Sequence, residues 1–404
     1  MLIYGIRHSF SVFFPPILSE FGWSRGSTAM MLSLFLLVYG LVAPFAGGLA
    51  DHWKPRRVMR IGLAIVVIAT AGCAFANELW HFYILFGVFI PIGSALCGWP
   101  IIAPALSQWF HKKRGLVIGL GQSGGGLSYT YGLFAEFVIS ILGWRQAYWV
   151  LAGVLLALVF PLYHLFYFSP NKKGMTAYGA VEEINPKDKV YERAAIEDSV
   201  YKDWTLRKAM KTYQLWLLIL SYALYWGVGN YLVLAHQVKF AEDVGYSTGF
   251  AASIFALFGI FMVAGQLSSS ISDWIGREQT MVLATTLSIG ALVALLLVKD
   301  TSQPFLLYIY AAFFGFGGGL CAPTVVAGTA DLFHGRNFGS IAGILLTGVG
   351  VGGVMGPWLG GYIYDVTGSY TTAFTICIVC IVLACLAFLI AAPRKAHLFR
   401  STNT

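Results

Sequence analysis

Four polar side chains near the N-terminus have the spacing of a single helical face. Tyr4, Arg7, His8 and Ser11 stand at positions i, i+3, i+4 and i+7 of the otherwise apolar stretch 1–18. An arginine at the centre of a span costs at least about 2.5 kcal/mol, so Arg7 is expected to face a water-filled cavity or a partner. The opposing interpretation is snorkelling, because Arg7 lies only about 9 Å along a helix that starts at Met1.

The residue types on this face suit a small organic anion. A planar guanidinium offers two parallel donors to a carboxylate, which favours Arg7 as an anion ligand. The His8 side chain titrates near physiological pH and is a candidate for moving a proton. Coupling to a proton and exchange against a counter-solute are both compatible with these residues.

The stretches that would position this face are those of a membrane protein. Hydrophobic residues make up 58% of the chain, charged residues 11%, and mean hydropathy is +0.72. A span needs roughly 20 apolar residues, and backbone groups in lipid must be satisfied within a helix. The expected spans are 1–18, 28–50, 58–77, 80–107, 115–141, 146–168, 212–236, 247–272, 278–298, 304–330, 336–364 and 369–392. This pattern predicts an all-α membrane protein with twelve transmembrane helices.

Basic residues indicate how the helices are oriented. Most of the 26 Lys and Arg fall on one side of the predicted bilayer, whereas the other side holds only Arg25, Arg145, Lys239 and Lys299. The positive-inside rule then places both termini in the cytoplasm, and short external loops favour a bacterial inner (plasma) membrane. The net charge of +8 therefore gives no reason to expect a nucleic-acid partner. The chain enters its first span almost at Met1, which leaves open a start upstream.

One long polar stretch divides the spans into six and six. It has too few large apolar residues to form a core of its own. The predicted parts are an N-terminal bundle at 1–168, a cytoplasmic linker at 169–211, a C-terminal bundle at 212–392 and a cytoplasmic tail at 393–404.

The two halves repeat each other. GGLADHWKPRR (47–57) corresponds to SSISDWIGR (269–277), and KKRGLVIGLGQSGG (112–125) corresponds to GRNFGSIAGILLTG (335–348). Asp51 and Asp273 are 222 residues apart, and so are Arg114 and Arg336. This common offset indicates a duplicated six-helix unit, which predicts two pseudo-symmetric bundles around a central site.

Charged residues in these repeated loops are candidates for a gate at the cytoplasmic side. An Asp beside basic residues in a short turn can bind a neighbouring helix end and the partner loop by charge-assisted bonds. The candidates are Asp51, Arg56, Arg57, Arg114, Asp273, Arg277, Asp331 and Arg336. The alternative is that these charges only solvate tight turns and determine topology.

Other polar residues in the spans are further candidates. Gln122 and Tyr129 stand seven residues apart in the fifth span and therefore share one stripe of the helix. Asn230 lies in the seventh span, where it could line a solute path. His236 ends that seventh span and is expected at the outer interface. All six Cys lie in apolar spans, so we expect inert packing rather than a redox or metal site.

Sequence motifs of other function classes do not occur. There is no GxxxxGK[ST] loop for a nucleotide-driven pump, and no HExxH or GxSxG motif for a membrane enzyme. We therefore expect no enzymatic activity, no cofactor and no metal.

The chain resembles the major facilitator superfamily. GGLADHWKPRR is similar to the superfamily's loop of Gly, Asp and clustered Arg, with His52 and Lys54 in place of the usual Arg and Gly. VFFPPILSEFGWSR (12–25), YAAFFGFGGG (310–319) and ADLFHGRNFGSIAG (330–343) resemble the monocarboxylate transporter and oxalate/formate antiporter branch. The resemblance implies the major facilitator fold and transport of a small carboxylate.

The chain departs from that branch at the substrate anchor. The branch has an Arg in its eighth span, with an acidic residue one turn earlier, where this sequence has Gln266 and Met262. The branch's lysine in the first span corresponds to His8. Arg7 would then replace the missing cation, and Gln266 would supply neutral hydrogen bonds.

These observations together predict a secondary transporter that moves a small organic anion, a monocarboxylate or related carboxylate, by alternating access. Two alternatives stay open. The loss of the eighth-span Arg favours export of an uncharged or aromatic compound, and the same scaffold could serve as a sensor that binds a solute without moving it.

Overall fold

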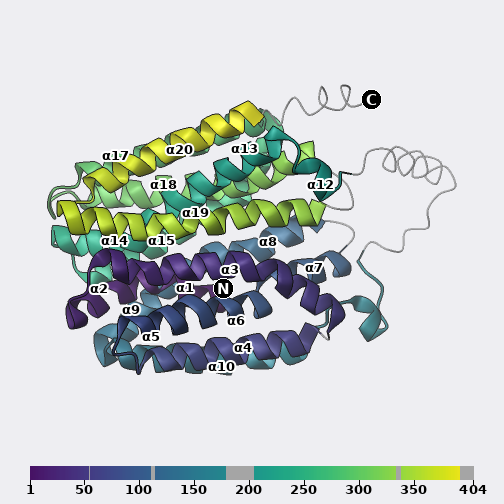
Figure 1. Cartoon of the computed structure of the whole chain (residues 1–404), viewed down its shortest axis with the longest axis horizontal. Coiled ribbons are helices and arrows are strands. Elements are labelled where there is room, and N and C mark those ends of the chain that lie inside the picture. The colour runs from purple at the N-terminus through teal and green to yellow at the C-terminus, as the bar shows by residue number, and fades with distance from the viewer. Residues whose placement is uncertain (54, 111–113, 179–203, 334–337, 392–404) are drawn as a thin grey trace.

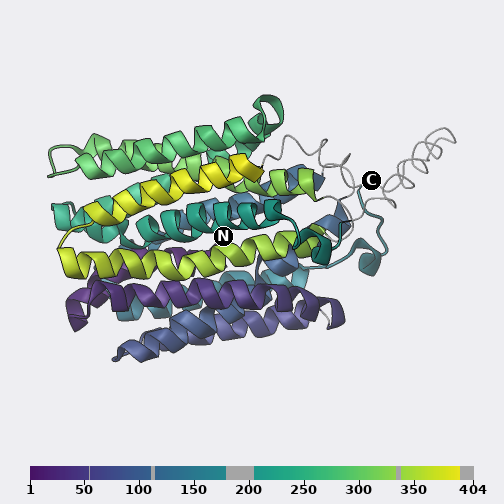
Figure 2. The same ribbon diagram turned by 45° about the horizontal axis from the view of Figure 1, so that its top comes forward.

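The computed structural model describes the chain except for residues 54, 111–113, 179–203, 334–337 and 392–404. The described residues form helices that align into two groups, as Figure 1 shows. In Figure 1 most helices of the first half lie in the lower part of the molecule and those of the second half in the upper part, with α8 (Arg114–Leu127) reaching the level of α14 (Tyr231–Val244) and α15 (Thr248–Leu267). In Figure 2, turned by 45°, the purple α3 (Arg25–His52) still lies beside the yellow-green α19 (Phe338–Thr367), where the halves meet.

Helices of the first half run in six rods. They are α1 (Leu2–His8) with α2 (Phe10–Phe21); α3 (Arg25–His52); α4 (Pro55–Cys73); α5 (Leu79–Ile84), the π-helical η1 (Leu85–Phe89), α6 (Ile90–Cys97) and α7 (Trp99–Trp109); α8 (Arg114–Leu127), η2 (Ser128–Thr130) and α9 (Tyr131–Leu142); and α10 (Trp144–Leu165). A short turn, η3 (Pro170–Lys173), follows.

The second half repeats this plan. After the single turn α12 (Leu206–Ala209) come α13 (Tyr213–Tyr222), η4 (Ala223–Asn230) and α14 (Tyr231–Val244); α15 (Thr248–Leu267), η5 (Ser268–Ser270) and α16 (Ile271–Ile275); α17 (Arg277–Leu297); α18 (Pro304–Leu332); α19 (Phe338–Thr367); and α20 (Thr371–Ala391). The predicted fold class of two six-helix bundles is confirmed for the part of the chain described. The predicted domain boundaries stay a prediction.

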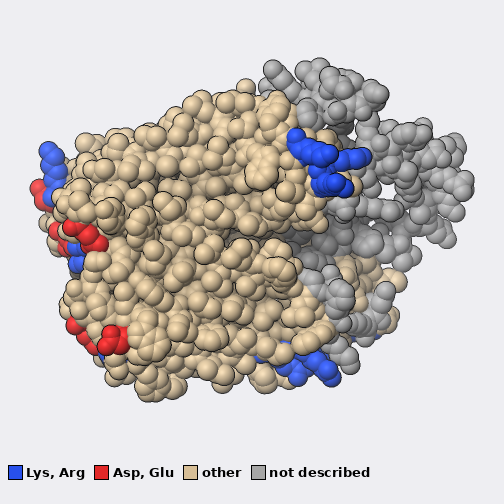
Figure 3. All heavy atoms as spheres, in the orientation of Figure 1, with Lys and Arg blue, Asp and Glu red and all other residues tan. Residues whose placement is uncertain are grey.

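Ten of the described helical segments are long and apolar enough to cross a membrane. The remaining two rods are α1 with α2, where the apolar helix Phe10–Phe21 is shorter, and α4, which packs beside α10. In Figure 3, the Lys, Arg, Asp and Glu side chains of the visible face lie at the two ends of the molecule, and the long middle is made of other residues. The protein is therefore a multi-pass membrane protein.

The two ends of the bundle differ in their connections. We call the end where α10 finishes and α13 begins the linker end. The distal end is the opposite one, where α2 and α14 finish and α3 and α20 begin. At the distal end Gly22 and Gly245 terminate α2 and α14 with positive φ angles of 64° and 108°, a conformation that glycine adopts without strain.

The halves meet along a seam where α3 packs against α19, α2 against α14, and α8 against α15. Small residues let the backbones approach closely along α3 and α19. A methyl group on Gly361 would lie 2.5 Å from the backbone of Arg25, and one on Gly353 would lie 2.8 Å from the Leu36 side chain. This seam bounds the site described next.

Candidate functional site

A small cavity lies on the seam, and both halves line it. Its walls are Arg7, His8, Ser11, Leu32, Tyr129, Tyr231, Leu234 and Phe255. The first five come from α1, α2, α3 and η2 of the first half, and the other three from α14 and α15 of the second half. A cavity between two halves that repeat each other is the geometry expected of a solute site in a transporter.

Arg7 brings a positive charge to this cavity. Its guanidinium carbon lies 5.2 Å from the ring centroid of Tyr4, 5.7 Å from that of Tyr231 and 5.9 Å from that of Phe35. Among the described residues, no Asp or Glu oxygen lies within ion-pair distance of it. Aromatic faces attract a cation weakly, so a guanidinium in this setting still has donors to offer an anion.

His8 is buried and ties α1 to η2. Arg7 donates from Nη2 to His8 Nε2 at 2.8 Å and from Nε to the same atom at 3.2 Å. On its other side, His8 Nδ1 lies 2.6 Å from Ser128 Oγ. The imidazole also stacks on the Tyr129 ring, with centroids 3.7 Å apart and planes 8° from parallel. His8 is thereby held on both nitrogens and one face.

The other two residues of the predicted face make structural hydrogen bonds. Tyr4 shares a 2.8 Å hydroxyl contact with Tyr39 and accepts from the Trp99 backbone N–H at 3.3 Å, a group that is free because the helix breaks at Gly98. Ser11 donates across the seam to the Leu234 carbonyl. Ser11 lines the cavity, whereas Tyr4 does not line it and contacts Arg7 with its ring.

Three further predicted residues do not line this cavity. Gln122 lies exposed in α8. Gln266 lies near Gly126 at the contact of α15 with α8, and its Oε1 has no hydrogen-bond partner among the described residues. Asn230 is fully buried and donates to the Tyr225 carbonyl at 2.9 Å. Of the residues predicted outside the first span, the cavity includes only Tyr129.

The predicted gate residues that the structure describes lie at helix ends near the linker end, and their described contacts each stay within one half. Arg56 donates to the Phe166 carbonyl at 2.5 Å and stacks on Tyr167 at 4.1 Å. Arg277 pairs with Asp273 at 2.6 Å and with Asp331 at 3.0 Å. Arg57 is exposed. The side chains of Asp51, Arg114 and Arg336 lie outside the described residues.

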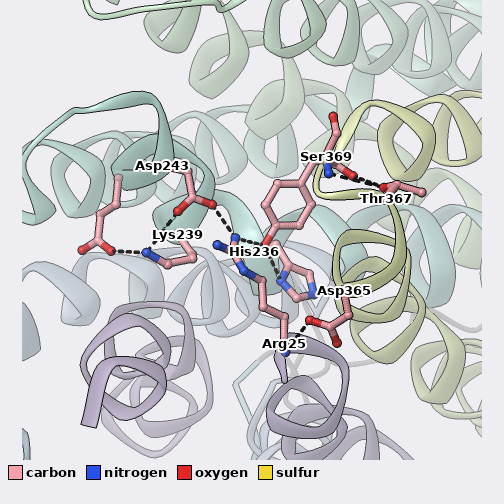
Figure 4. Close-up of polar contacts among 9 residues, drawn as sticks. Arg25, His236, Lys239, Asp243, Asp365, Thr367 and Ser369 are labelled. Carbon is pink, nitrogen blue, oxygen red and sulfur yellow. Dashed lines mark hydrogen bonds and ion pairs between the residues drawn. The ribbon is translucent and has the colours of Figure 1, made fainter. Parts of the chain in front are cut away.

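Sequence reasoning did not identify one cluster of residues at the distal end, which we call the clamp. It consists of Arg25 on the first half and Asp243, Asp365 and Tyr370 on the second. Figure 4 labels Arg25, Asp243 and Asp365. Arg25 forms an ion pair with Asp243 and donates from Nη1 to the Tyr370 hydroxyl at 2.9 Å. The guanidinium also lies 3.5 Å from the centroid of the Tyr364 ring. These contacts hold the halves together at this end.

Asp365 adds a second link between the halves in this clamp. Its two carboxylate oxygens accept from the backbone N–H groups of Arg25 and Gly26, each at 2.8 Å. These are the first residues of α3, so a carboxylate from the second half caps a helix of the first half. Separating the halves here would leave those N–H groups without that partner.

Further residues support the clamp from within the second half. Lys239 pairs with Asp243 at 3.1 Å, and His236 approaches the Tyr370 hydroxyl at 3.2 Å and the Pro357 carbonyl at 2.8 Å. Burial raises the pKa of Tyr370 above its ordinary value, so this hydroxyl acts as a neutral hydrogen-bonding group. The expectation that His236 lies at an outer interface is wrong. The helix α14 continues for about two turns beyond it to Val244, and the His236 side chain is buried.

The sequence does contain a signal for the clamp, namely opposite charges at the ends of separate apolar stretches. Residue spacing within a single helix does not reveal it. A cation and two carboxylates stand at the ends of three apolar stretches that all reach the distal side. Arg25 begins α3, whereas Asp243 and Asp365 lie in the last turns of α14 and α19. Comparing charges across span ends, rather than along each span, would have found these residues.

Comparisons with known proteins agree over nearly the whole chain. The family model described as Major Facilitator Superfamily matches residues 1–308 and 269–403. Monocarboxylate transporter 13 of Rattus norvegicus is 25% identical over 382 residues, which cover 93% of this chain and 82% of the relative. Monocarboxylate transporter 12 of Homo sapiens is 24% identical over 417 residues, covering 98% and 79%.

Two further matches are a transport protein named for a different substrate and a solved structure. A probable hexose phosphate transport protein of Chlamydia trachomatis is 24% identical over 368 residues, covering 85% of this chain and 78% of that protein. The fold is similar to a bacterial homologue of the human lysosomal transporter Spinster, in an inward-facing and occupied conformation, with a TM-score of 0.70. That match has 16% identity and covers 97% of this chain and 94% of the other.

Proposed function

Because the chain belongs to the Major Facilitator Superfamily and is a membrane transporter of a small-molecule solute, we propose that its solute is a small organic anion, a monocarboxylate or related carboxylate. Alternating access would expose the cavity to each side of the membrane in turn. The monocarboxylate transporters among its relatives support this substrate class.

The observation that carries this proposal is Arg7. It lines a cavity between the two halves, and no described carboxylate pairs with it. A cation in a site of low dielectric gains more from binding an anion than it would in water. The cavity's other walls are apolar or aromatic apart from His8 and Ser11, which suits a solute with one charged end.

The second part of the proposal concerns the two gates and the orientation of the protein in the membrane. The distal clamp would close the cavity on one side of the membrane, and the charged loops near the linker end would gate the other. From the distribution of basic residues we infer that the linker end and both termini are cytoplasmic, in an inner (plasma) membrane.

Counterflow in proteoliposomes tests the substrate class. Vesicles loaded with unlabelled pyruvate should take up external radiolabelled pyruvate, and Arg7→Ala should lower this uptake at least about a hundredfold, since the carboxylate loses its cation. Arg7→Lys should keep part of the activity, because it retains the charge but not the planar fork. Lys299→Ala is the matched control, because it removes an exposed cation that is not part of the cavity lining.

Normal uptake by a correctly inserted Arg7→Ala protein would reject the anion site. A wider panel of mono- and dicarboxylates, with counterflow and thermal shift measured together, separates the remaining classes. Binding without counterflow would indicate a sensor.

A second candidate has an observation in its favour. Tyr129, Tyr231 and Phe255 give the cavity three aromatic walls, which would also accept an uncharged aromatic compound. Stabilisation by neutral aromatic ligands that survives in Arg7→Ala would favour this candidate over an anion.

A further inference from the structure

The hydrogen bonds around His8 determine which of its nitrogens carries the proton. A guanidinium has donors only, so His8 Nε2 must present its lone pair to Arg7 at 2.8 and 3.2 Å. Ser128 Oγ donates its own proton to the Gly125 carbonyl at 2.5 Å and therefore accepts at His8 Nδ1. The network thus assigns a neutral imidazole with its proton on Nδ1.

A second proton on this imidazole would break the network. It would convert Nε2 from an acceptor into a donor facing another donor, and it would place two cations in contact. The charged group that contacts His8 among the described residues is the Arg7 guanidinium, which is positive. The facing groups on η2, α14 and α15 are the neutral side chains of Ser128, Tyr129, Tyr231 and Phe255. The described walls of the cavity hold no carboxylate to offset a second positive charge.

The same contacts orient Arg7. His8 Nε2 occupies the edge of the guanidinium formed by Nε and Nη2, so Nη1 and the outer N–H of Nη2 stay available. A carboxylate can use that free end with two parallel bonds. Stacking on Tyr129 and the bond to Ser128 keep the imidazole from turning away.

We propose that His8 is a positioning residue that stays neutral and aims Arg7 at the solute, and that it does not carry a proton through the transport cycle. This proposal rests on the proposed function only in the part that concerns the solute. The tautomer and the hold on Arg7 concern the chain itself and are tested separately.

The first test needs no solute. Protein labelled with ¹⁵N-histidine is studied by NMR in lipid nanodiscs, and the signals of His8 are assigned by their loss in His8→Gln. We expect a protonated Nδ1 and a bare Nε2 from about pH 8 to about pH 5.5. An imidazolium that appears within that range, or a proton on Nε2 instead, would overturn the proposal.

The second test compares two variants in counterflow of radiolabelled pyruvate. His8→Gln keeps an acceptor at the reach of Nε2 but cannot take up a proton, so its rate should stay within about threefold of the original chain with the same pH profile. His8→Ala removes the acceptor and should raise KM about tenfold, with little change in maximal rate. Ser128→Ala should fall between the two.

The two tests fail in different ways. If the unaltered protein moves no carboxylate, the proposed function is lost while the NMR result still decides the role of His8. If His8→Gln is as impaired as His8→Ala and its pH dependence is abolished, His8 carries the proton and the positioning role is wrong.

Discussion

Two arginines of the first half lie where the two halves meet, and they differ in the groups that surround them. Arg25 at the distal end finds Asp243, the hydroxyl of Tyr370 and the ring of Tyr364. Arg7 in the cavity finds three aromatic rings and the lone pair of His8, and no described carboxylate. A cation with an internal partner holds two surfaces together, whereas one without such a partner is free to bind a solute anion.

The two arginines also differ in how far their contacts offset the free energy of burying a charge. The Arg25 and Asp243 side chains keep 13% and 24% of their exposure, so water screens their attraction and the pair contributes modestly. A clamp of this strength can be opened during a transport cycle. The energy of desolvating Arg7 is offset only in part by its rings and His8, and binding an anion would supply the rest.

The largest effect is expected from giving Arg7 an internal carboxylate. Leu32 lines the same cavity, and Leu32→Asp would make Arg7 resemble Arg25. The new ion pair would occupy the free end of the guanidinium, so counterflow of pyruvate should fall about a hundredfold or more. Leu32→Asn has nearly the same shape without the charge and should lose less than about tenfold. Equal losses in the two variants would show that shape, not charge, governs the site.

The next effect concerns the close approach that lets the clamp form. In Gly361→Ala the added methyl group would lie 2.5 Å from the backbone of Arg25, which cannot move aside as a side chain can. Overpacking of this kind costs about 1–3 kcal/mol, so α3 and α19 should separate at the distal end. Spin labels at Leu142→Cys and Thr301→Cys, exposed sites on the two halves, would report the wider distance. Gly153→Ala, with open space around it, is the control.

A smaller shift is expected from removing the clamp's cation. Arg25→Ala breaks the bonds to Asp243 and Tyr370, and after discounting for screening we expect a loss of about 1–2 kcal/mol. The same pair of spin labels should then show about a tenfold larger population open at the distal end. An unchanged distance distribution would mean that packing alone closes this end. Cys380 should first be replaced, because it is the half-buried native cysteine.

Local patterns in the sequence predicted the helices and part of the site, for a physical reason. Helical spacing places Arg7, His8 and Ser11 on one face, and that face does meet the cavity. The same reasoning could not decide how each helix is rotated and tilted against its partners. Gln122 and Gln266 therefore have suitable residue types but lie away from the cavity.

Local sequence patterns could not predict the contacts between the two halves. The residues that meet in the clamp are separated in sequence by 218 positions for Arg25 and Asp243 and by 340 for Arg25 and Asp365. Such pairs depend on how the two bundles dock, and neither periodicity nor the internal repeat specifies that. The burial of His236 was missed for a related reason, since the apolar stretch ends before the helix does.

The finest distinction within the clamp separates its charge from its capping of α3. Asp365→Asn keeps one oxygen as an acceptor for the N–H groups of Arg25 and Gly26 but loses the negative charge beside the helix N-terminus. We expect a loss of about 0.3–1 kcal/mol in closure of the distal end, reduced further by salt. Asp365→Ala removes both contributions and should cost about 1 kcal/mol more, with a weaker dependence on salt for that extra part. If both variants open the distal end equally, the hydrogen-bonded cap contributes nothing beyond the negative charge of Asp365.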